Sequence, residues 1–225
     1  MAEGDPIAGR GAQKQMNNRF FEYTSERIIE LEDIPQEQVG STQYIPIHPK
    51  TIMNKVSSPD LRHDYSLNPY QGCEHGCVYC YARNSHQYWG YNAGLEFEQK
   101  ILVKHNSPAL LRSLFESKNW KASPFMLSGN TDCYQPIERK LKLTRSILEL
   151  CLEFRHPVGI VTKNYLVTRD IDILTELAKD DLVHVAMSIT TLNESLRRKL
   201  EPRTTTGAQR IKAVAQLSAA GVPVH

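Results

Sequence analysis

Three cysteines stand close together in the chain: Cys73 and Cys77 are separated by three residues, and Cys77 and Cys80 by two. Thiolates at this spacing can turn inward around a compact metal centre, and Gly72 and Gly76 give the loop the backbone freedom to wrap it. Three close thiolates without an adjacent fourth leave one iron of a 4Fe-4S cluster open to a further ligand. The spacing therefore predicts such a cluster.

A structural zinc site is the main alternative, because His75, Cys133 or a more distant histidine could supply a fourth ligand. Zinc frameworks usually show two paired ligand motifs, and the sequence has one. The five cysteines are an odd number, and the start lacks the apolar stretch of a signal peptide, so we expect reduced thiols in a cytoplasm. Cys151 is expected as a buried apolar residue, whereas Cys133 is either packing or a reactive, catalytic thiol.

The 225 residues are 40% hydrophobic and 23% charged. This composition supplies the core of one large domain or two small ones and excludes disorder of the whole chain. No apolar run approaches the roughly 20 residues of a membrane span. The net charge of +2 is too small to indicate a nucleic-acid partner by itself.

Residues 1–60 lack a periodic apolar pattern and are rich in Gln, Asn, Gly, Pro and Ser. We expect a partly irregular N-terminal arm there, with Phe20, Phe21 and Tyr23 as an anchor. Residues 61–225 are expected to form the core domain.

In the core domain, short apolar runs alternate with amphipathic stretches, which predicts an α/β fold of parallel βα units. The expected strands are 95–104, 124–127, 158–161 and 182–189, with 222–225 as the start of another. The expected helices begin at Ser107 or Pro108, span 138–154, follow a cap at Thr168, and span 208–220. Polar turns follow the strands at 71–80, 128–132, 162–164 and 188–191, and in a parallel barrel all four converge on one mouth.

The CxxxCxxC pattern, with Tyr79 just before the third cysteine, resembles that of radical S-adenosylmethionine (radical SAM) enzymes. The likeness extends to further blocks, which include LSGNTDCYQPIERKLKLTRSILE, VTKNYLVTRD and VAMSITTLNESLRRKLEPRTTTGAQRIKAV. Together, these blocks resemble the sequences of the radical SAM subfamily labelled DNA repair photolyase, which is related to spore photoproduct lyase (SplB-like). The match runs from about residue 58 to the end, and GRGA and NNRF in the arm resemble it too.

The resemblance implies that Cys73, Cys77 and Cys80 bind three irons of a 4Fe-4S cluster, and that S-adenosylmethionine (SAM) chelates the fourth. Lys163 resembles the cation that pairs with the SAM carboxylate, although ordinary loop polarity also explains it. The resemblance also places Tyr79 beside the adenine and the Ser188 hydroxyl near the ribose or carboxylate. The turn implied to accept the SAM amine consists of Ser128, Gly129, Asn130, Thr131 and Asp132.

Three further expectations follow from the family blocks. Glu201 and Arg203 are expected to form an ion pair that braces the fourth βα loop, and His86 is expected to be structural. Spore photoproduct lyases carry a hydrogen-donating cysteine where Asn130 aligns. Either Cys133 performs that task from a shifted position, or this subfamily repairs no thymine dimer, and we favour the second.

The implied fold is a partial (βα)6 TIM-like barrel, and because the chain stops as the fifth strand begins, we expect it to be truncated. The implied function is reductive cleavage of SAM to a 5′-deoxyadenosyl radical that abstracts hydrogen from a substrate, with damaged DNA as one candidate. A flavodoxin- or ferredoxin-type donor would supply the electron. The alternative is a non-catalytic nucleic-acid-binding protein stabilised by zinc or an iron-sulfur cluster.

Overall fold

The structure is a computed structural model that describes residues 7, 9–14, 16, 18–20, 41–57 and 64–225. Of the expected anchor in the arm, Phe21 and Tyr23 lie outside these residues. The described part of the arm contains two strands, β1 (Gln43–Pro46) and β2 (Met53–Lys55), which pair with strands of the core.

The main sheet has the strand order β2-β3-β6-β7-β8. Strands β3 (Tyr65–Leu67), β6 (Phe125–Leu127), β7 (Val158–Thr162) and β8 (Val183–Met187) run parallel, whereas β2 is antiparallel to β3. Neighbouring parallel strands require crossover connections, and here these connections contain helices. The predicted α/β fold of parallel βα units is confirmed.

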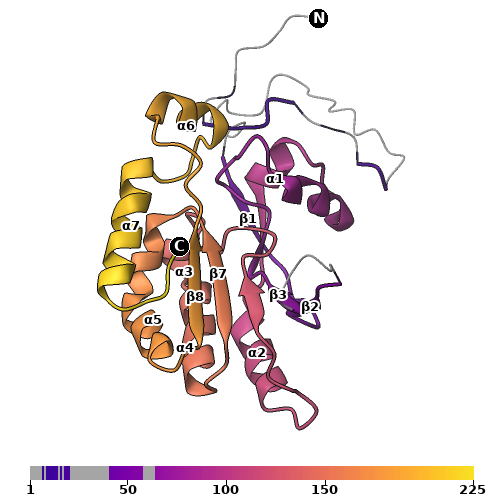
Figure 1. Ribbon diagram of the computed structural model, residues 1–225. Coiled ribbons are helices and arrows are strands. Elements are labelled where there is room, and N and C mark those ends of the chain that lie inside the picture. The colour runs from indigo at the N-terminus through magenta and orange to yellow at the C-terminus, as the bar shows by residue number, and fades with distance from the viewer. Residues whose placement is uncertain (1–6, 8, 15, 17, 21–40, 58–63) are drawn as a thin grey trace, which may run out of the picture.

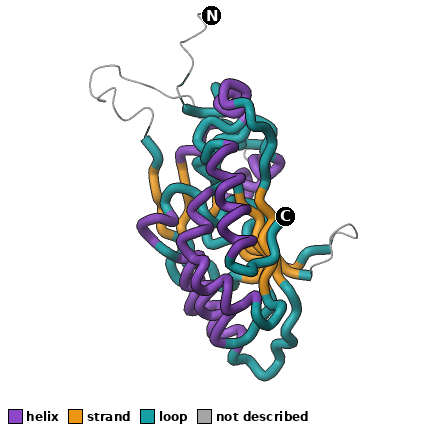
Figure 2. The backbone as a smooth tube through the Cα atoms, turned by 60° about the vertical axis from the view of Figure 1, so that its left-hand side comes forward, coloured by secondary structure: helices purple, strands orange, loops and turns teal. Residues whose placement is uncertain are grey.

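Helices lie along one side of these strands (Figures 1 and 2). Between β6 and β8 they are α3 (Glu138–Leu141), α4 (Leu143–Glu153), the 3₁₀ segment η3 (Tyr165–Asp170) and α5 (Ile171–Ala178). After β8 come α6 (Glu194–Leu200) and α7 (Gly207–Ala219). Among the described residues, no helix is long and apolar enough to cross a membrane.

The connection from β3 to β6 contributes two strands to a second, smaller sheet with the order β1-β5-β4, in which β1 of the arm is the third strand. Its strands β4 (Tyr70–Gln71) and β5 (Lys100–Val103) flank the cysteine loop, the 3₁₀ segment η2 (Tyr81–Trp89) and α1 (Leu95–Gln99). Helix α2 (Ser107–Phe115) then leads back to β6. The cysteine loop therefore begins directly after β4 of this smaller sheet.

The main core lies between the parallel strands and the helices that cover them. Helix α4 contributes Ile147, Leu148 and Cys151, and α5 contributes Leu174 and Leu177, all of which are buried against the strands. Burial raises the pKa of Cys151. The expectation that Cys151 is a buried apolar residue is confirmed.

Three expected elements differ from the structure. The helix cap expected at Thr168 is wrong, because Asn164 caps η3 and α5 begins only at Ile171. The Thr168 hydroxyl donates to the Tyr165 carbonyl instead.

Residues 95–99 form helix α1 and only 100–103 form a strand, because Glu98 is buried in contacts with distant segments that local alternation does not reveal. The single helix expected over 138–154 is divided at Lys142, which has a left-handed φ of 54°. The Glu138 carboxylate accepts the N–H of Thr144 across this break.

The last residues begin another parallel strand, as expected. Val224 forms a parallel bridge with Val185 of β8, and the N–H of His225 donates to the carbonyl of Val185. The expectations of six βα units and of truncation are not tested by these contacts and stay predictions.

Leu174→Ala is expected to lower the free energy of unfolding by about 2–5 kcal/mol, because it leaves a cavity in the main core. Leu174 is completely buried, whereas Leu192 is 62% exposed. The control Leu192→Ala is therefore expected to change that free energy by less than about 0.5 kcal/mol. Urea denaturation of the metal-free protein measures both, and equal losses would contradict the assigned core.

Candidate functional site

The polar turns after the parallel strands meet at one end of the main sheet. The side chain of Asn68, just after β3, accepts the N–H groups of Asn130 and Thr131 from the turn after β6 at 2.9 and 3.2 Å. The N–H of Ser188, just after β8, donates to the carbonyl of Thr162 at the end of β7. The predicted convergence of the strand ends is therefore present in the structure.

The cysteine loop is tied to its surroundings through backbone hydrogen bonds. Cys73 N–H donates to the Phe97 carbonyl and Val78 N–H to the Leu200 carbonyl, both at 2.9 Å. Gly72 has a φ of 82°, and a Cβ there would lie 2.9 Å from two carbonyl oxygens. A glycine is thus required at this turn, as the sequence predicted.

The three cysteines of the CxxxCxxC loop differ in burial. Cys73 is buried, Cys77 and Cys80 are half-buried, and all are free. Among the described residues no group of three His, Cys, Asp or Glu side chains is arranged to hold a single metal ion. In a cluster each thiolate binds a different iron, whereas one zinc ion needs all its ligands within bonding distance of the same point. Three free thiols are the donors that a 4Fe-4S cluster takes, and the assignment of each cysteine to one iron stays a prediction.

Burial favours the neutral thiol at two of the cysteines, Cys73 and Cys77. Burial raises the pKa of Cys73 well above its usual value and that of Cys77 to about 12, although Lys163 acts in the opposite direction on Cys77. Ligation requires thiolates, so cluster assembly must release these protons.

Asp132 joins three loops. Its carboxylate accepts the Thr162 hydroxyl and the Lys163 N–H at 2.8 Å, and it pairs with His75 of the cysteine loop at 3.3 Å. Burial by itself raises the pKa of Asp132. His75 and the backbone N–H groups of Lys163 and Tyr134 lower the pKa by more than burial raises it, so it lies below its usual value. The Asp132 carboxylate, which was expected to contact SAM, therefore contacts other residues of the protein instead.

In the rest of the 128–132 turn, two residues shape the turn itself and two contact the neighbouring 3₁₀ segment. The Ser128 hydroxyl accepts the N–H of Cys133 at 2.7 Å, and the Thr131 hydroxyl donates to the Tyr70 carbonyl at 2.6 Å, so both hydroxyls shape the turn. The Gly129 carbonyl accepts the Tyr81 hydroxyl of the neighbouring 3₁₀ segment. The half-buried Asn130 donates its amide to Ser85 at 3.0 Å.

Lys163 and Tyr79 lie together, as the resemblance implies. The Lys163 ammonium is 5.9 Å from the centre of the Tyr79 ring and lowers the pKa of Cys77. Tyr79 is 50% exposed. A cation, an aromatic ring and the cluster ligands thus share one surface at the end of the sheet.

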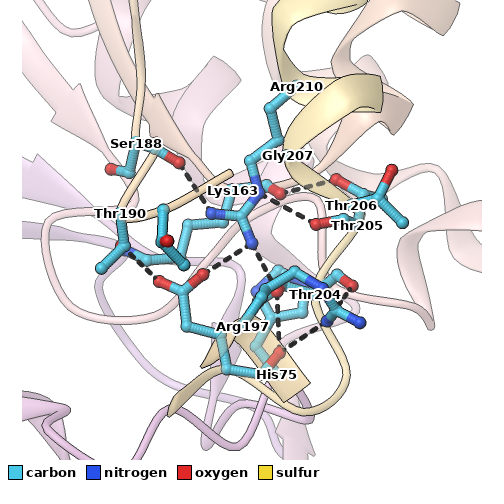
Figure 3. Close-up of polar contacts among 12 residues, drawn as sticks. His75, Lys163, Ser188, Thr190, Arg197, Thr204, Thr205, Thr206, Gly207 and Arg210 are labelled. Atoms are coloured by element: carbon cyan, nitrogen blue, oxygen red, sulfur yellow. Dashed lines mark hydrogen bonds and ion pairs between the residues drawn. The ribbon is translucent and has the colours of Figure 1, made fainter. Parts of the chain in front are cut away.

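Glu201 and Arg210 form a completely buried ion pair of 2.6 Å behind Tyr79. The Glu201 carboxylate also accepts the hydroxyls of Tyr79 and Thr190. Arg210 donates to the Ser188 carbonyl at 3.0 Å and reaches the loop before α7 (Figure 3). This pair fixes Tyr79 relative to the strand end that carries Ser188.

Sequence reasoning identified Glu201 but not its partner. The expected ion pair with Arg203 is wrong, because Arg203 lies 3.7 Å from Glu74 instead. Arg210 shares one face of α7 with Ala213 and Leu217, which are buried. An arginine at helical spacing among apolar core positions was the signal available in the sequence.

The structure does not bring Cys133 to the site. The side chain is completely buried in the main core, and burial raises the pKa of the thiol well above its usual value. Its carbonyl accepts the Thr144 hydroxyl at 2.6 Å. Of the two alternatives for Cys133, the packing role agrees with this placement, and the catalytic assignment does not.

His86 is a buried residue of η2. Its ring stacks on Tyr91 at 5.1 Å and meets Phe97 edge-on at 5.6 Å. Burial lowers the pKa of His86 to about 4. These contacts agree with the structural role expected from the sequence.

Comparison with known proteins agrees with this geometry. Residues 67–225 match the radical SAM superfamily. The chain belongs to this superfamily. Its members bind a 4Fe-4S cluster and SAM, so these are the cofactors of the site.

Relatives of this superfamily member come from distant organisms. An uncharacterized protein of Mycobacterium tuberculosis is 34% identical over 78% of this chain and 52% of its own length. An uncharacterized protein of Methanocaldococcus jannaschii is 31% identical over 80% of this chain and 64% of its own length. The chain therefore spans about half to two thirds of the length of these relatives.

Solved structures of spore photoproduct lyase share the fold. A complex with dinucleoside spore photoproduct has a TM-score of 0.56 and 19% identity, over 80% of this chain and 49% of the other. A mutant of that enzyme with bound AdoMet and the same photoproduct has a TM-score of 0.55 and 18% identity, over 80% and 48% of the two chains. The resemblance to the SplB-like radical SAM group is confirmed at the level of the fold.

Arg210→Met is expected to lower the free energy of unfolding by about 3–5 kcal/mol, because it leaves the Glu201 carboxylate buried without its cation. Adding Glu201→Gln removes that charge, so the double variant is expected to be more stable than Arg210→Met alone. Urea denaturation measures these values. The matched control is Arg112→Met, whose ion pair with Glu153 is exposed, with an expected loss below about 1 kcal/mol. A double variant less stable than Arg210→Met would contradict the assigned pair.

Folding stability is expected to fall as the pH is lowered from 6.5 to 4, in part because of His86. Its pKa is about 4 in the folded chain and 6.5 ordinarily, so the unfolded chain binds more protons in this window, worth up to about 3 kcal/mol. His86→Phe keeps a ring in the stack and removes the titration. The difference in unfolding free energy between pH 7 and pH 4.5 should therefore be smaller in this variant, and an unchanged difference would contradict the prediction.

Proposed function

We propose that this chain forms the catalytic core of an enzyme that cleaves SAM reductively and abstracts a hydrogen atom from an organic substrate. One observation carries the proposal: the CxxxCxxC loop after β4 lies beside Lys163 at the end of β7, with the Gly129 carbonyl in the turn after β6 held in the same set of loops. Active sites of parallel βα folds occupy this end of the strands.

The chain's own residues orient the cofactors. Cys73, Cys77 and Cys80 would each hold one iron, and the Lys163 ammonium suits the carboxylate of SAM. The Gly129 carbonyl suits the SAM amine, and Ser188 lies at the next strand end. A reduced cluster held by these residues would supply one electron to the sulfonium of SAM, and cleavage of the C5′–S bond to methionine and a 5′-deoxyadenosyl radical would provide the group that takes hydrogen from the substrate.

The electron would come from a flavodoxin- or ferredoxin-type donor in a reducing cytoplasm, which agrees with five free thiols. Damaged DNA is one candidate substrate, because structures with this fold are complexes of spore photoproduct lyase with a dinucleoside spore photoproduct. The burial of Cys133, with Asn130 at the position of the donor cysteine, favours a reaction other than thymine-dimer repair.

Anaerobic reconstitution with iron and sulfide, followed by dithionite and SAM, tests the proposal. We expect a reduced-cluster EPR signal and 5′-deoxyadenosine, with both lost in Cys77→Ala. Cys151→Ala is the matched control, because Cys151 lies in the main core, and it should retain both. One zinc per chain, no response to SAM, and salt-sensitive nucleic-acid binding would instead support a non-catalytic binding protein.

A second measurement addresses the substrate. With the cluster assembled, 5′-deoxyadenosine formation is compared without DNA, with unirradiated DNA and with irradiated DNA. Equal rates in all three, with no repaired product, would support a substrate other than damaged DNA. Stimulation by irradiated DNA, retained in Cys133→Ala, would support a repair reaction that does not use this thiol.

A further inference from the structure

The N-terminal segment 10–12 lies directly on the cysteine loop, although it is outside the residues that match the superfamily. A Cβ on Gly11 would lie 1.8 Å from the Gly76 carbonyl oxygen and 3.2 Å from the Val78 side chain. Since a Cβ does not fit at these distances, the two backbones meet at a contact that requires glycine.

Glu98 of α1 connects this segment to the core. Its carboxylate accepts the N–H of Gly11 at 3.1 Å and that of Ala12 at 2.7 Å. It also forms an ion pair of 2.6 Å with Arg83, and the Glu98 side chain is completely buried. A buried carboxylate depends on such donors, so removing the N-terminal segment would leave Glu98 short of two hydrogen bonds.

Arg83 extends the connection to a cluster ligand. Its guanidinium donates to the Cys77 carbonyl from Nη2 at 2.8 Å and from Nε at 3.3 Å. The same Nη2 pairs with Glu98. A continuous set of contacts therefore runs from Gly11 and Ala12, through Glu98 and Arg83, to the backbone of Cys77. We call the four residues Gly11, Ala12, Glu98 and Arg83 the Glu98 clamp.

We propose that the Glu98 clamp holds the cysteine loop in the shape that retains the cluster, with Gly11 and Glu98 as positioning residues. The inference rests on the proposed function only in that the loop binds a cluster. A loop ordered by protein contacts needs little further ordering when metal binds, so its ligands stay in place when one iron–sulfur bond opens. Loosening the clamp should therefore speed loss of iron.

The test uses the reconstituted full chain and measures the rate of iron release to a chelator without SAM. Gly11→Ala is expected to release iron at least about tenfold faster than the wild type, the effect of losing one hydrogen bond to a buried charge. The EPR signal of its reduced cluster should broaden. Glu98→Gln should behave similarly, and the double variant should be no faster than the faster single variant, because both changes open the same clamp.

Gly221→Ala is the matched control for general destabilisation. Gly221 has a φ of 78° and no atom within 4 Å of an added Cβ, so the substitution strains a turn after α7 without touching the clamp. It should lower the Tm of the metal-free protein, yet release iron at the wild-type rate. A wild-type rate of iron release in Gly11→Ala, or an equally accelerated release in Gly221→Ala, would overturn the proposal. Failure of the wild type to assemble a cluster would instead contradict the proposed function.

Discussion

The carboxylate of Asp132 is the point at which the loops of the site are joined. It accepts the Thr162 hydroxyl and the Lys163 N–H from the end of β7 and pairs with His75 in the cysteine loop. None of these contacts belongs to a helix or a ladder of strands, so the loops depend on side chains to satisfy their backbone groups. Without Asp132, the Lys163 backbone and the cysteine loop would lose the carboxylate that both of them contact.

Two other buried carboxylates connect the cysteine loop in the same way. Glu201 joins the ring of Tyr79 to Arg210, and Glu98 joins the N-terminal segment to Arg83. Desolvating charges is costly, and an apolar substitute of equal volume often gives similar stability. What a carboxylate adds is direction, since several donors must meet it at fixed angles. Their arrangement around the site therefore agrees with a role in geometry more than in stability.

The sequence predicted those features that depend on local pattern. The cysteine spacing, the strand ends with polar turns, and the buried Cys151 all follow from neighbours along the chain, and the structure agrees with them. The helix at residues 95–99, the break at Lys142 and the Glu201–Arg210 pair did not follow. Each depends on a buried charged residue whose partner comes close only in the folded chain. The periodicity of apolar residues along the sequence does not identify that partner.

The same contacts hold the cysteine loop and the aromatic rings beside it. The cysteine loop is held by backbone hydrogen bonds to Phe97 and Leu200 and by the carboxylates around it. Two aromatic rings beside the cluster ligands are exposed, Tyr79 at 50% and Tyr81 at 76%. Both are held through their hydroxyls, which donate to Glu201 and to the Gly129 carbonyl. Function depends on the site more than on the fold, so one cofactor chemistry can serve different substrates within the superfamily.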